Sequence, residues 1–517
     1  MATAVALGLR LLQLFLGGAL FGVTEYDDGV YVGAAIRLVG GVLPYRDFVL
    51  VQPPGVVLLM APVAALGKLT GTAWAMGIGR LLTAAAGAAA VPLTGLLVRH
   101  RGVLAVAISC GVMAVYPDSI LAARTVLQEP WLVLACVAGL LAVFDGDRLT
   151  TSGKRLAWGG VAFGFAGAIK LWAIFPVVVI AVICLPRAGR ALAYLGGVAA
   201  GFLVPVLPFL FGAPSSFVKG VVLAQLVRVD DARVPLVTRL ADLSGIVSSE
   251  STTVHVPAAL AIAAAVLIVG LVVACYAGLW RLTPGPLRRA GSLLPPLDRF
   301  ALATAVILVI AFLWPVDFYY HYAGFFTPFL ALAVALPVAR LVRALRPVAR
   351  RRSPRPRFDR TVAGVIGGAF LAMVIAGVVT ESVAQQAYSP AAAAGRVIPK
   401  GACVLTDQAA LTILANRFTS SAPGCAAVVD GFGTDLDLSK GRNGATGAAR
   451  TAAVRQVWNS AFQHAQYVWL SDAPSDTTGS ADRRIAWTPA LRSYFTRNFR
   501  QVSAHPLIYK RTVLSPS

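Results

Sequence analysis

Long apolar stretches separated by short basic loops fill most of this chain, and they limit its fold more than any other feature. About eleven stretches have roughly the 17–25 residues that an α-helix needs to cross the hydrocarbon core of a bilayer. Their centres are near Phe15, Gly87, Ile108, Val137, Phe163, Val179, Val204, Leu267, Leu308, Ala331 and Met373. A shorter apolar segment, residues 53–66, begins with two prolines, and we expect it to lie in the membrane interface or to re-enter the membrane. We therefore predict an α-helical polytopic membrane protein.

The composition supports this prediction and argues against a nucleic-acid-binding protein. Of the 517 residues, 57% are hydrophobic and 13% are charged, whereas about 25% are charged in soluble domains. A mean hydropathy of +0.74 reflects more apolar surface than one soluble core could bury. The net charge is +22, but the basic residues lie between the apolar stretches and not in a nucleic-acid-binding motif. Membrane lipids are the expected surroundings, and no nucleic acid is expected as a partner.

The basic loops predict the orientation of the chain in a cytoplasmic membrane. With the N-terminus in the cytoplasm, every strongly basic short loop falls on the cytoplasmic side, as the positive-inside rule requires. These loops include residues 99–101, 148–155, 187–190, 281–299 and 340–360. We interpret the last of them as an anchor against anionic lipid. The segments predicted outside are then residues 24–54, residues 213–254 and the tail.

The tail differs in kind from the rest of the chain. Residues 384–517 are polar, with short alternating runs at 402–405 and 467–470, and they predict a small extracytoplasmic α/β domain after a membrane domain of residues 1–383. An outer location favours a disulfide between Cys403 and Cys425. The other four cysteines lie within apolar stretches, and we expect them to be core residues.

An acidic segment follows the first apolar stretch. Glu25, Asp27 and Asp28 lie within four residues at the predicted membrane surface, where like charges repel one another. A carboxylate in this place can act as a general base toward a hydroxyl group. The alternative is a solvated loop whose acids cap a helix.

The residues that follow resemble a known family. Asp27-Asp28-x-x-Tyr31, the run Gly41-x-x-Pro-Tyr45-Arg46-Asp47 and the Pro53-Pro54 pair together resemble the first outer loop of GT-C membrane glycosyltransferases. The branch is that of bacterial protein O-mannosyltransferases and aminoarabinose transferases, and the abundance of alanine and arginine is typical of an actinobacterial member. The resemblance implies that Asp27 is the catalytic base with Asp28 beside it, and that Tyr31, Tyr45, Arg46 and Asp47 bind substrate. Asp28 replaces the commoner glutamate, and no sequon-binding motif of oligosaccharyltransferases is found.

Four residues farther along the chain extend the predicted site. Glu129 is a catalytic candidate, although an acid at a helix start can simply complement the helix dipole. Lys170 lies between two apolar stretches and is costly in lipid, so it either faces the site or extends to the membrane surface. His321 and Tyr322 belong to an aromatic segment that is also typical of an interfacial belt.

The second predicted outer loop supplies further cations. Arg228 and Arg239 can bind a phosphate bidentately, or they are solvated charges. Asp27, Asp28 and His321 carry oxygen and imidazole donors that suit a divalent metal ion. The resemblance covers both metal-dependent and metal-independent enzymes, and our prediction is that no metal is required.

The resemblance implies an inverting sugar transfer from a polyprenyl-phosphate donor to a hydroxyl of a glycan, lipid or protein acceptor on the outer face of the membrane. An envelope glycan such as arabinan or mannan, or a glycoprotein, is the expected product. Two other classes remain open: a transporter or flippase for a lipid-linked sugar, and a non-catalytic envelope-assembly protein. An Asp27→Asn variant separates them, because only a transferase would lose turnover while keeping its fold and donor binding.

Overall fold

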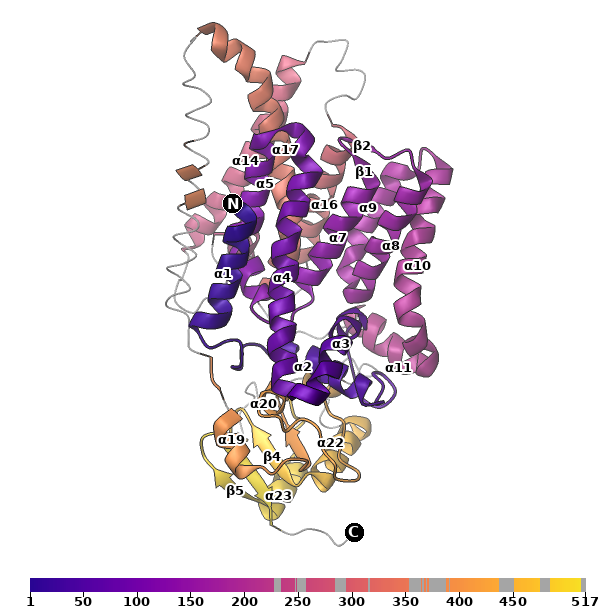
Figure 1. Cartoon of the computed structure of the whole chain (residues 1–517), viewed down its shortest axis with the longest axis vertical. Coiled ribbons are helices and arrows are strands. Elements are labelled where there is room, and N and C mark those ends of the chain that lie inside the picture. The colour runs from indigo at the N-terminus through magenta and orange to yellow at the C-terminus, as the bar shows by residue number, and fades with distance from the viewer. Residues whose placement is uncertain are drawn as a thin grey trace.

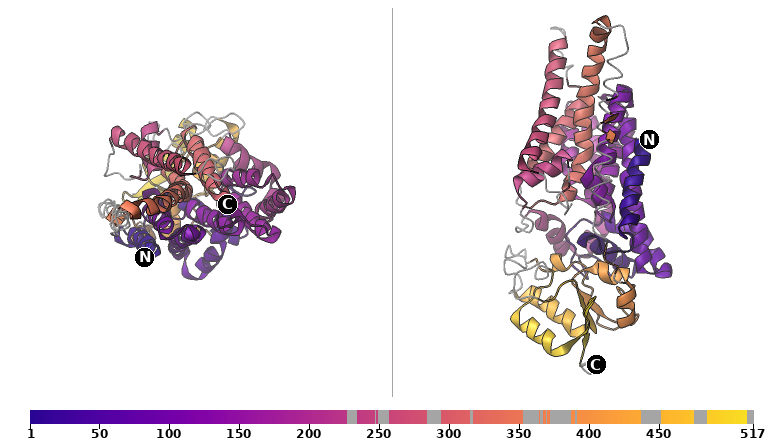
Figure 2. Two further views of the ribbon diagram at one scale, coloured as in Figure 1. Left: turned by 90° about the horizontal axis from the view of Figure 1, so that it is seen from above. Right: turned by 90° about the vertical axis from the view of Figure 1, so that its left-hand side faces the viewer.

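A bundle of membrane-spanning and shorter apolar helices makes up most of the molecule, with a small α/β part at one end (Figures 1 and 2). The computed structural model describes residues 1–226, 234–246, 248, 257–283, 294–314, 317–352, 364, 367–368, 370–371, 387–389, 391–436, 451–474 and 484–512. The main helices of the bundle are α1 (Ala2–Leu16), α4 (Thr72–Val98), α5 (Val103–Val115), α6 (Pro117–Ala123), α7 (Glu129–Val143), α8 (Gly153–Ile169), α9 (Ile174–Cys184), α10 (Ala188–Gly212), α14 (Ala258–Leu282), α16 (Pro296–Leu313) and α17 (Tyr320–Arg352).

Every predicted span centre among the described residues lies in one of these helices, but fewer helices than predicted are long enough to cross a membrane unaided. Among the described residues, five helices are both long and apolar enough, and the bent pair α5 and α6 makes a sixth if it counts as one span. That pair bends by 53° at Tyr116, because the residue before a proline disfavours helical backbone. Other apolar helices, such as α1 and α7, are shorter than 18 residues. The span predicted near Met373 lies outside the described residues.

Two further helices lie at the end of the bundle that carries the α/β part (Figure 1). They are α2 (Tyr26–Val39) and α3 (Gly55–Thr70), and they pack against each other. The apolar segment with two prolines therefore forms α3, with Pro54 just before its first residue. The short helix η2 (Leu171–Ala173) follows α8. The short helices that follow α10 are α11 (Pro214–Val218), η3 (Lys219–Leu223), α12 (Ala224–Leu226) and α13 (Leu236–Ser244).

Helices α8 and α10 touch backbone to backbone. A Cβ atom added to Gly160 or Gly164 of α8 would lie 2.1 Å from a carbonyl oxygen of α10. The same 2.1 Å separates Gly197 and Gly201 of α10 from carbonyl oxygens of α8. Such small residues four positions apart let two helices pack closely inside a membrane. This contact fixes α8, the helix that leads into Lys170.

The C-terminal part contains the predicted α/β fold. A four-stranded sheet has the order β3-β4-β6-β5, in which β3 and β4 are parallel and the other pairs are antiparallel. The strands predicted near residues 402–405 and 467–470 are β3 and β4. The elements are α19 (Ala391–Val397), β3 (Val404–Thr406), α20 (Ala409–Leu414), α21 (Gly431–Thr434), α22 (Ala452–His464), β4 (Tyr467–Leu470), α23 (Pro489–Asn498), β5 (Phe499–Ser503) and β6 (Leu507–Arg511).

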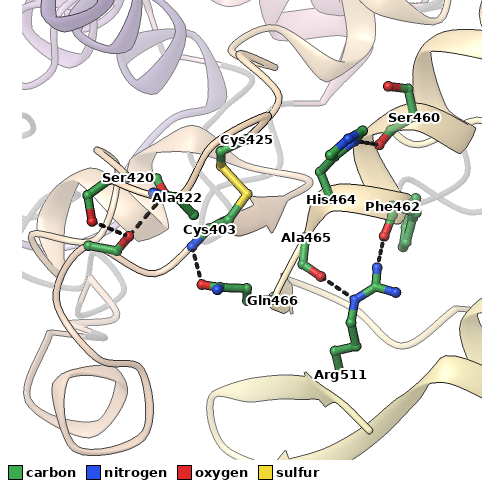
Figure 3. Close-up of a disulfide and its surroundings, with 12 residues drawn as sticks. Cys403, Ser420, Ala422, Cys425, Ser460, Phe462, His464, Ala465, Gln466 and Arg511 are labelled. Carbon is green, nitrogen blue, oxygen red and sulfur yellow. Dashed lines mark hydrogen bonds between the residues drawn. A yellow bond between two sulfur atoms is a disulfide. The ribbon is translucent and has the colours of Figure 1, made fainter. Parts of the chain in front are cut away.

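The predicted disulfide between Cys403 and Cys425 is present in this part (Figure 3). It closes a loop whose ends are 22 residues apart and which includes α20. Nearby, the guanidinium of Arg511 on β6 donates to the carbonyl of Ala465 at 2.8 Å, which joins β6 to the end of α22. The disulfide thus fastens the loop that carries α20 to the start of the sheet.

Basic turns lie at the other end of the bundle (Figure 1). This end includes η1 (Arg99–Arg101) and the hairpin of β1 (Phe144–Asp145) and β2 (Arg148–Leu149). The carboxylate of Asp298, which is fully buried, binds Arg101 at 2.5 Å and Arg340 at 3.1 Å. The bundle therefore separates its basic turns from the acidic segment and the α/β part.

Candidate active site

Three residues that the sequence singled out separately meet in one buried cluster. Glu129 is the first residue of α7, Lys170 follows the last residue of α8, and His321 is the second residue of α17. One oxygen of the Glu129 carboxylate, Oε1, accepts from Lys170 Nζ at 2.5 Å and contacts His321 Nδ1 at 2.8 Å. The three residues are only 2%, 4% and 8% exposed. Pairing is what makes such charges tolerable in an apolar surrounding.

Local backbone and aromatic contacts explain how Lys170 and His321 reach Glu129. The chain leaves helical geometry at Lys170, where φ is −153° and ψ is 134°, so the side chain turns away from the α8 axis. The Lys170 ammonium lies 4.7 Å from the centre of the Tyr322 ring, a cation–π contact. The His321 ring stacks on Tyr319 at 5.6 Å. These residues are part of the cluster and not an aromatic belt on the protein surface.

Asp28 is held by an ion pair inside the protein. Its carboxylate is fully buried and binds the guanidinium of Arg80 on α4, with one contact at 3.1 Å through Nε. The hydroxyl of Thr125 donates to the same carboxylate oxygen at 2.6 Å. Asp28 therefore joins α2 to α4 and to the segment before α7. The sequence analysis missed Arg80, although an arginine inside a 27-residue apolar helix is itself a sign of a buried partner.

Asp27 has a more open environment than Asp28. It is half-buried, and the hydroxyl of Tyr31 donates to its Oδ2 at 3.4 Å. Tyr31 itself is buried one helical turn farther along α2. Among the ion pairs of the described residues none involves Asp27. Of the two predicted acids, Asp28 is thus the one held by an ion pair among the described residues, and Asp27 is the one with a hydrogen bond from Tyr31.

The acidic segment and the buried cluster belong to one region. The hydroxyl of Tyr320 donates to Glu25 Oε2 at 3.2 Å, and Tyr320 is the neighbour of His321 in the chain. On the other side, Thr125 binds Asp28 four residues before Glu129. The start of α2 therefore lies beside the starts of α7 and α17. The structure thus joins Glu129, Lys170 and His321 by direct contacts and places the turn that carries Asp27 and Asp28 near the starts of α7 and α17.

The loop before α3 has contacts of its own. Tyr45 has a left-handed backbone, with φ of 67°, and its hydroxyl donates to the carbonyl of Gln52 at 2.6 Å. Arg46 and Asp47 form an ion pair of 2.8 Å at the surface. Hydrogen bonds from Arg46 and from the backbone of Leu43 lower the pKa of Asp47. None of these contacts reaches Asp27 or Glu129, so these residues shape the loop, and their contacts with substrate stay a prediction.

The two predicted arginines of the second outer loop differ in what can be said of them. Arg228 lies outside the described residues. Arg239, on α13, is buried, and it donates to the carbonyls of Val234 at 3.0 Å and Phe312 at 3.1 Å. Its guanidinium also lies 5.5 Å from the centre of the Phe318 ring. Arg239 thus borders the aromatic segment that leads into α17.

In the sequence, Asp27, Asp28 and His321 carry donors that suit a divalent metal ion. Among the described residues, no three His, Cys, Asp or Glu side chains gather closely enough to hold a metal ion. Asp28 is directed at Arg80 and His321 at Glu129. These two side chains therefore face different partners in this structure.

Comparisons with known proteins place the fold. No family model matches the sequence, and no curated protein matches it. The solved structure of ArnT from Cupriavidus metallidurans in the apo state is similar over 100% of this chain and 98% of its own, with a TM-score of 0.59 and 13% identity. ArnT bound to undecaprenyl phosphate gives a TM-score of 0.56 over the same shares, also with 13% identity.

A second solved structure has the same arrangement. The oligosaccharyltransferase AglB from Archaeoglobus fulgidus, in complex with an inhibitory peptide and a dolichol-phosphate, is similar over 100% of this chain and 75% of its own, with a TM-score of 0.53 and 14% identity. These likenesses show that the chain has the GT-C fold, which the sequence predicted. It is a multi-pass membrane protein with a C-terminal α/β part.

Proposed function

We propose that this protein is a glycosyltransferase that moves a sugar from a polyprenyl phosphate to an acceptor hydroxyl on the outer face of the cytoplasmic membrane. The observation that supports it most is the placement of Asp27. Its carboxylate is half-buried and free of ion pairs among the described residues, beside a buried Glu129–Lys170–His321 cluster. A base and a cationic group side by side are what this reaction requires.

Asp27 is the proposed base. Its carboxylate takes the proton of the acceptor hydroxyl while that oxygen attacks the anomeric carbon of the sugar. The bond between the anomeric carbon and the phosphate oxygen breaks in the same displacement, and its electrons leave with the polyprenyl phosphate. One displacement inverts the configuration at the anomeric carbon. The hydrogen bond from Tyr31 keeps the Asp27 side chain in place without removing its charge.

Lys170 is the proposed partner of the leaving phosphate, with His321 beside it. A phosphate that gains negative charge is stabilised by a cation already in position, and such stabilisation is a large part of catalysis in a water-poor site. Glu129 holds both side chains through one oxygen. We propose that Glu129 orients Lys170 and His321, and that Arg239 borders the donor from the side of α13.

Two features support the donor and the side of the membrane. The similar folds include one ArnT structure that contains undecaprenyl phosphate and one AglB structure that contains a dolichol-phosphate. The basic turns lie at the end of the bundle opposite to the site (Figure 1), an arrangement that supports an outer-face site under the positive-inside rule. We propose an envelope glycan, lipid or protein hydroxyl as acceptor, and a pentose such as arabinose or a hexose such as mannose as the sugar.

The test is sugar transfer by the purified full-length protein in detergent or vesicles, with radiolabelled polyprenyl-phosphate arabinose and mannose as donors and envelope extract as acceptor. Asp27→Asn should lower turnover by at least roughly 100-fold while donor binding is kept. Asp145→Asn, an exposed acid at the opposite end, is the matched control and should transfer normally. Donor movement across vesicles without any glycosyl product would support a flippase instead, and normal transfer by Asp27→Asn would refute Asp27 as the base.

A further inference from the structure

Helix α2 begins with three consecutive residues that point in three directions. Successive side chains on an α-helix are about 100° apart. Asp28 faces Arg80 of the membrane bundle, and Tyr26 faces Asp430 of the α/β part. Asp27 lies between them in sequence and so projects between the two anchored sides. The direction of the proposed base is therefore set by contacts of its two neighbours.

Tyr26 is fastened to the α/β part by its hydroxyl and its ring. The hydroxyl donates to Asp430 Oδ1 at 3.2 Å and accepts from the backbone N–H of Phe432 at 2.9 Å. The guanidinium of Arg484 lies 5.1 Å from the centre of the Tyr26 ring. Burial, with the charge of Asp430, raises the pKa of Tyr26, so the hydroxyl keeps its proton for this bond.

The same face of α2 continues along the α/β part. Gly29 and Gly33 follow Tyr26 at helical spacing, and a Cβ atom at Gly29 would lie 2.4 Å from the backbone nitrogen of Ala410 in α20. At Gly33 a Cβ atom would lie 3.0 Å from the ring of Phe418. The two glycines thus let the α/β part approach the α2 backbone itself. Because no flexible side chain lies in the contact at Gly29, a shift of the α/β part moves the α2 backbone directly.

A further contact reaches the residue before α2. The side-chain amide of Gln408 donates to the carbonyl of Glu25 at 3.3 Å, and Arg484 donates to Gln408 Oε1 at 3.4 Å. Arg484 therefore links both contacts of the α/β part with this turn. On the membrane side the same turn is held by Tyr320 through Glu25. The turn that carries Asp27 is clamped between the two parts of the molecule.

We propose that the α/β part positions the Asp27 carboxylate, and that Tyr26 is the positioning residue through which it does so. The inference rests on the proposed function and gives the C-terminal part a role in catalysis. Tyr26 need not touch donor or acceptor. It fixes the rotation of the first turn of α2 about its axis, and a reacting carboxylate displaced by about 1 Å can lose up to roughly 100-fold in rate.

Kinetics of variants at Tyr26 and Asp430 test the clamp. Tyr26→Phe removes only the hydroxyl and should lower kcat about tenfold with the donor KM changed by less than about twofold. Asp430→Ala should lose at least as much, because Asp430 Oδ1 also accepts from the backbone N–H of Gly433 at 2.8 Å. The double variant should lose less than the sum of the two single losses, because both substitutions remove the bond between Tyr26 and Asp430. Asp430→Asn keeps an oxygen acceptor and should restore most of the rate. Tyr467→Phe, on β4 of the same part, is the matched control and should keep the normal rate.

Hydrogen exchange of the full-length protein supplies a measurement that does not need activity. In Tyr26→Phe the amides at the start of α2 should exchange faster, while those of β4 and β6 stay protected. A normal kcat in Tyr26→Phe would overturn the inference, even with faster exchange, because Tyr26 would then be structural only. Unchanged exchange would overturn the clamp. If the wild-type protein transfers no sugar, the proposed function fails, and faster exchange at α2 would still support the clamp itself.

Discussion

The two ends of the helix bundle each bury an acid against two basic side chains, but the basic side chains differ. At the end with the basic turns, Asp298 binds Arg101 and Arg340, and Arg101 also binds Asp147 at 2.6 Å. At the end with the α/β part, Glu129 binds Lys170 and His321. Arginine stays protonated at all ordinary pH, whereas lysine and histidine can exchange protons when their surroundings change.

The contrast separates a structural ion pair from a candidate catalytic one. Burial and pairing are alike at both ends, so neither property identifies the active site. What differs is the type of cation and the neighbourhood. The Asp298 network joins α16, α17 and η1, whereas the Glu129 cluster lies beside Asp27 and an aromatic wall. We therefore expect the first to contribute stability and propose the second for chemistry.

Replacing the lysine of the Glu129–Lys170–His321 cluster should have the largest effect. Lys170→Met keeps the length of the side chain and removes its charge, and we expect sugar transfer to fall by roughly 100- to 1000-fold because the leaving phosphate loses its partner. Turnover of the purified variant, with its fold verified by gel filtration, measures this. Arg101→Met is the matched change at the other end and should leave turnover per folded molecule intact. Equal losses in both variants would erase the contrast.

Breaking the structural network should mainly cost stability. In Asp298→Asn the buried Arg101 and the part-buried Arg340 lose their shared carboxylate, and the free energy of unfolding should fall by about 3 kcal/mol. Thermal unfolding in detergent measures the loss, and transfer by the molecules that remain folded should be normal. A turnover defect without a lower Tm would contradict the assignment of this network to stability.

The disulfide offers a smaller effect on the side of the α/β part. Cys403→Ser should lower the stability of that part by about 2 kcal/mol, because the reduced chain regains freedom in a loop with ends 22 residues apart. Since the loop includes α20, exchange at the start of α2 should also rise slightly. Limited proteolysis of the full-length protein, with Cys184→Ser as the control, measures the change. Proteolysis at the wild-type rate would show that the sheet holds the loop by itself.

The smallest effect is a pH dependence at the basic end. Burial alone would raise the pKa of Asp147, but hydrogen bonds from His100 and Arg101 outweigh it and lower the pKa. A lowered folded pKa contributes stability above the unfolded value, and this stability is lost as pH falls through the folded value. Because Asp147 is partly exposed, the contribution should stay below about 1 kcal/mol. In Asp147→Asn the fall in Tm between pH 5 and pH 3 should be smaller than in the wild-type protein, by an amount that corresponds to roughly this contribution. An equal fall in both proteins would refute the prediction.

The helices and the C-terminal strands were predictable because their signals are local. Apolar length located the spans around residues such as Gly87 and Leu308, and a short apolar run located β4, whose four residues are all buried. The bend at Tyr116 was harder to predict, since the chain on both sides of it is apolar. Local patterns mark an element well and its ends poorly.

The sequence predicted which residues belong to the site, but not how they pair. Glu129 and His321 are 192 residues apart in sequence, and no spacing rule joins them. The pairing of Asp28 with Arg80 also escaped the sequence, because acid and cation lie on different helices. Tyr26 was not singled out, since an aromatic residue at a membrane surface is ordinary and only the fold shows its bond to Asp430. Which of two adjacent acids stays unpaired is a property of tertiary structure.

The glycine contacts between α8 and α10 have one more consequence. With backbone against backbone at four positions, these helices form a closed seam that no isoprenoid chain can part. Under the proposed function, a lipid-borne substrate therefore reaches Lys170 along another side of the bundle.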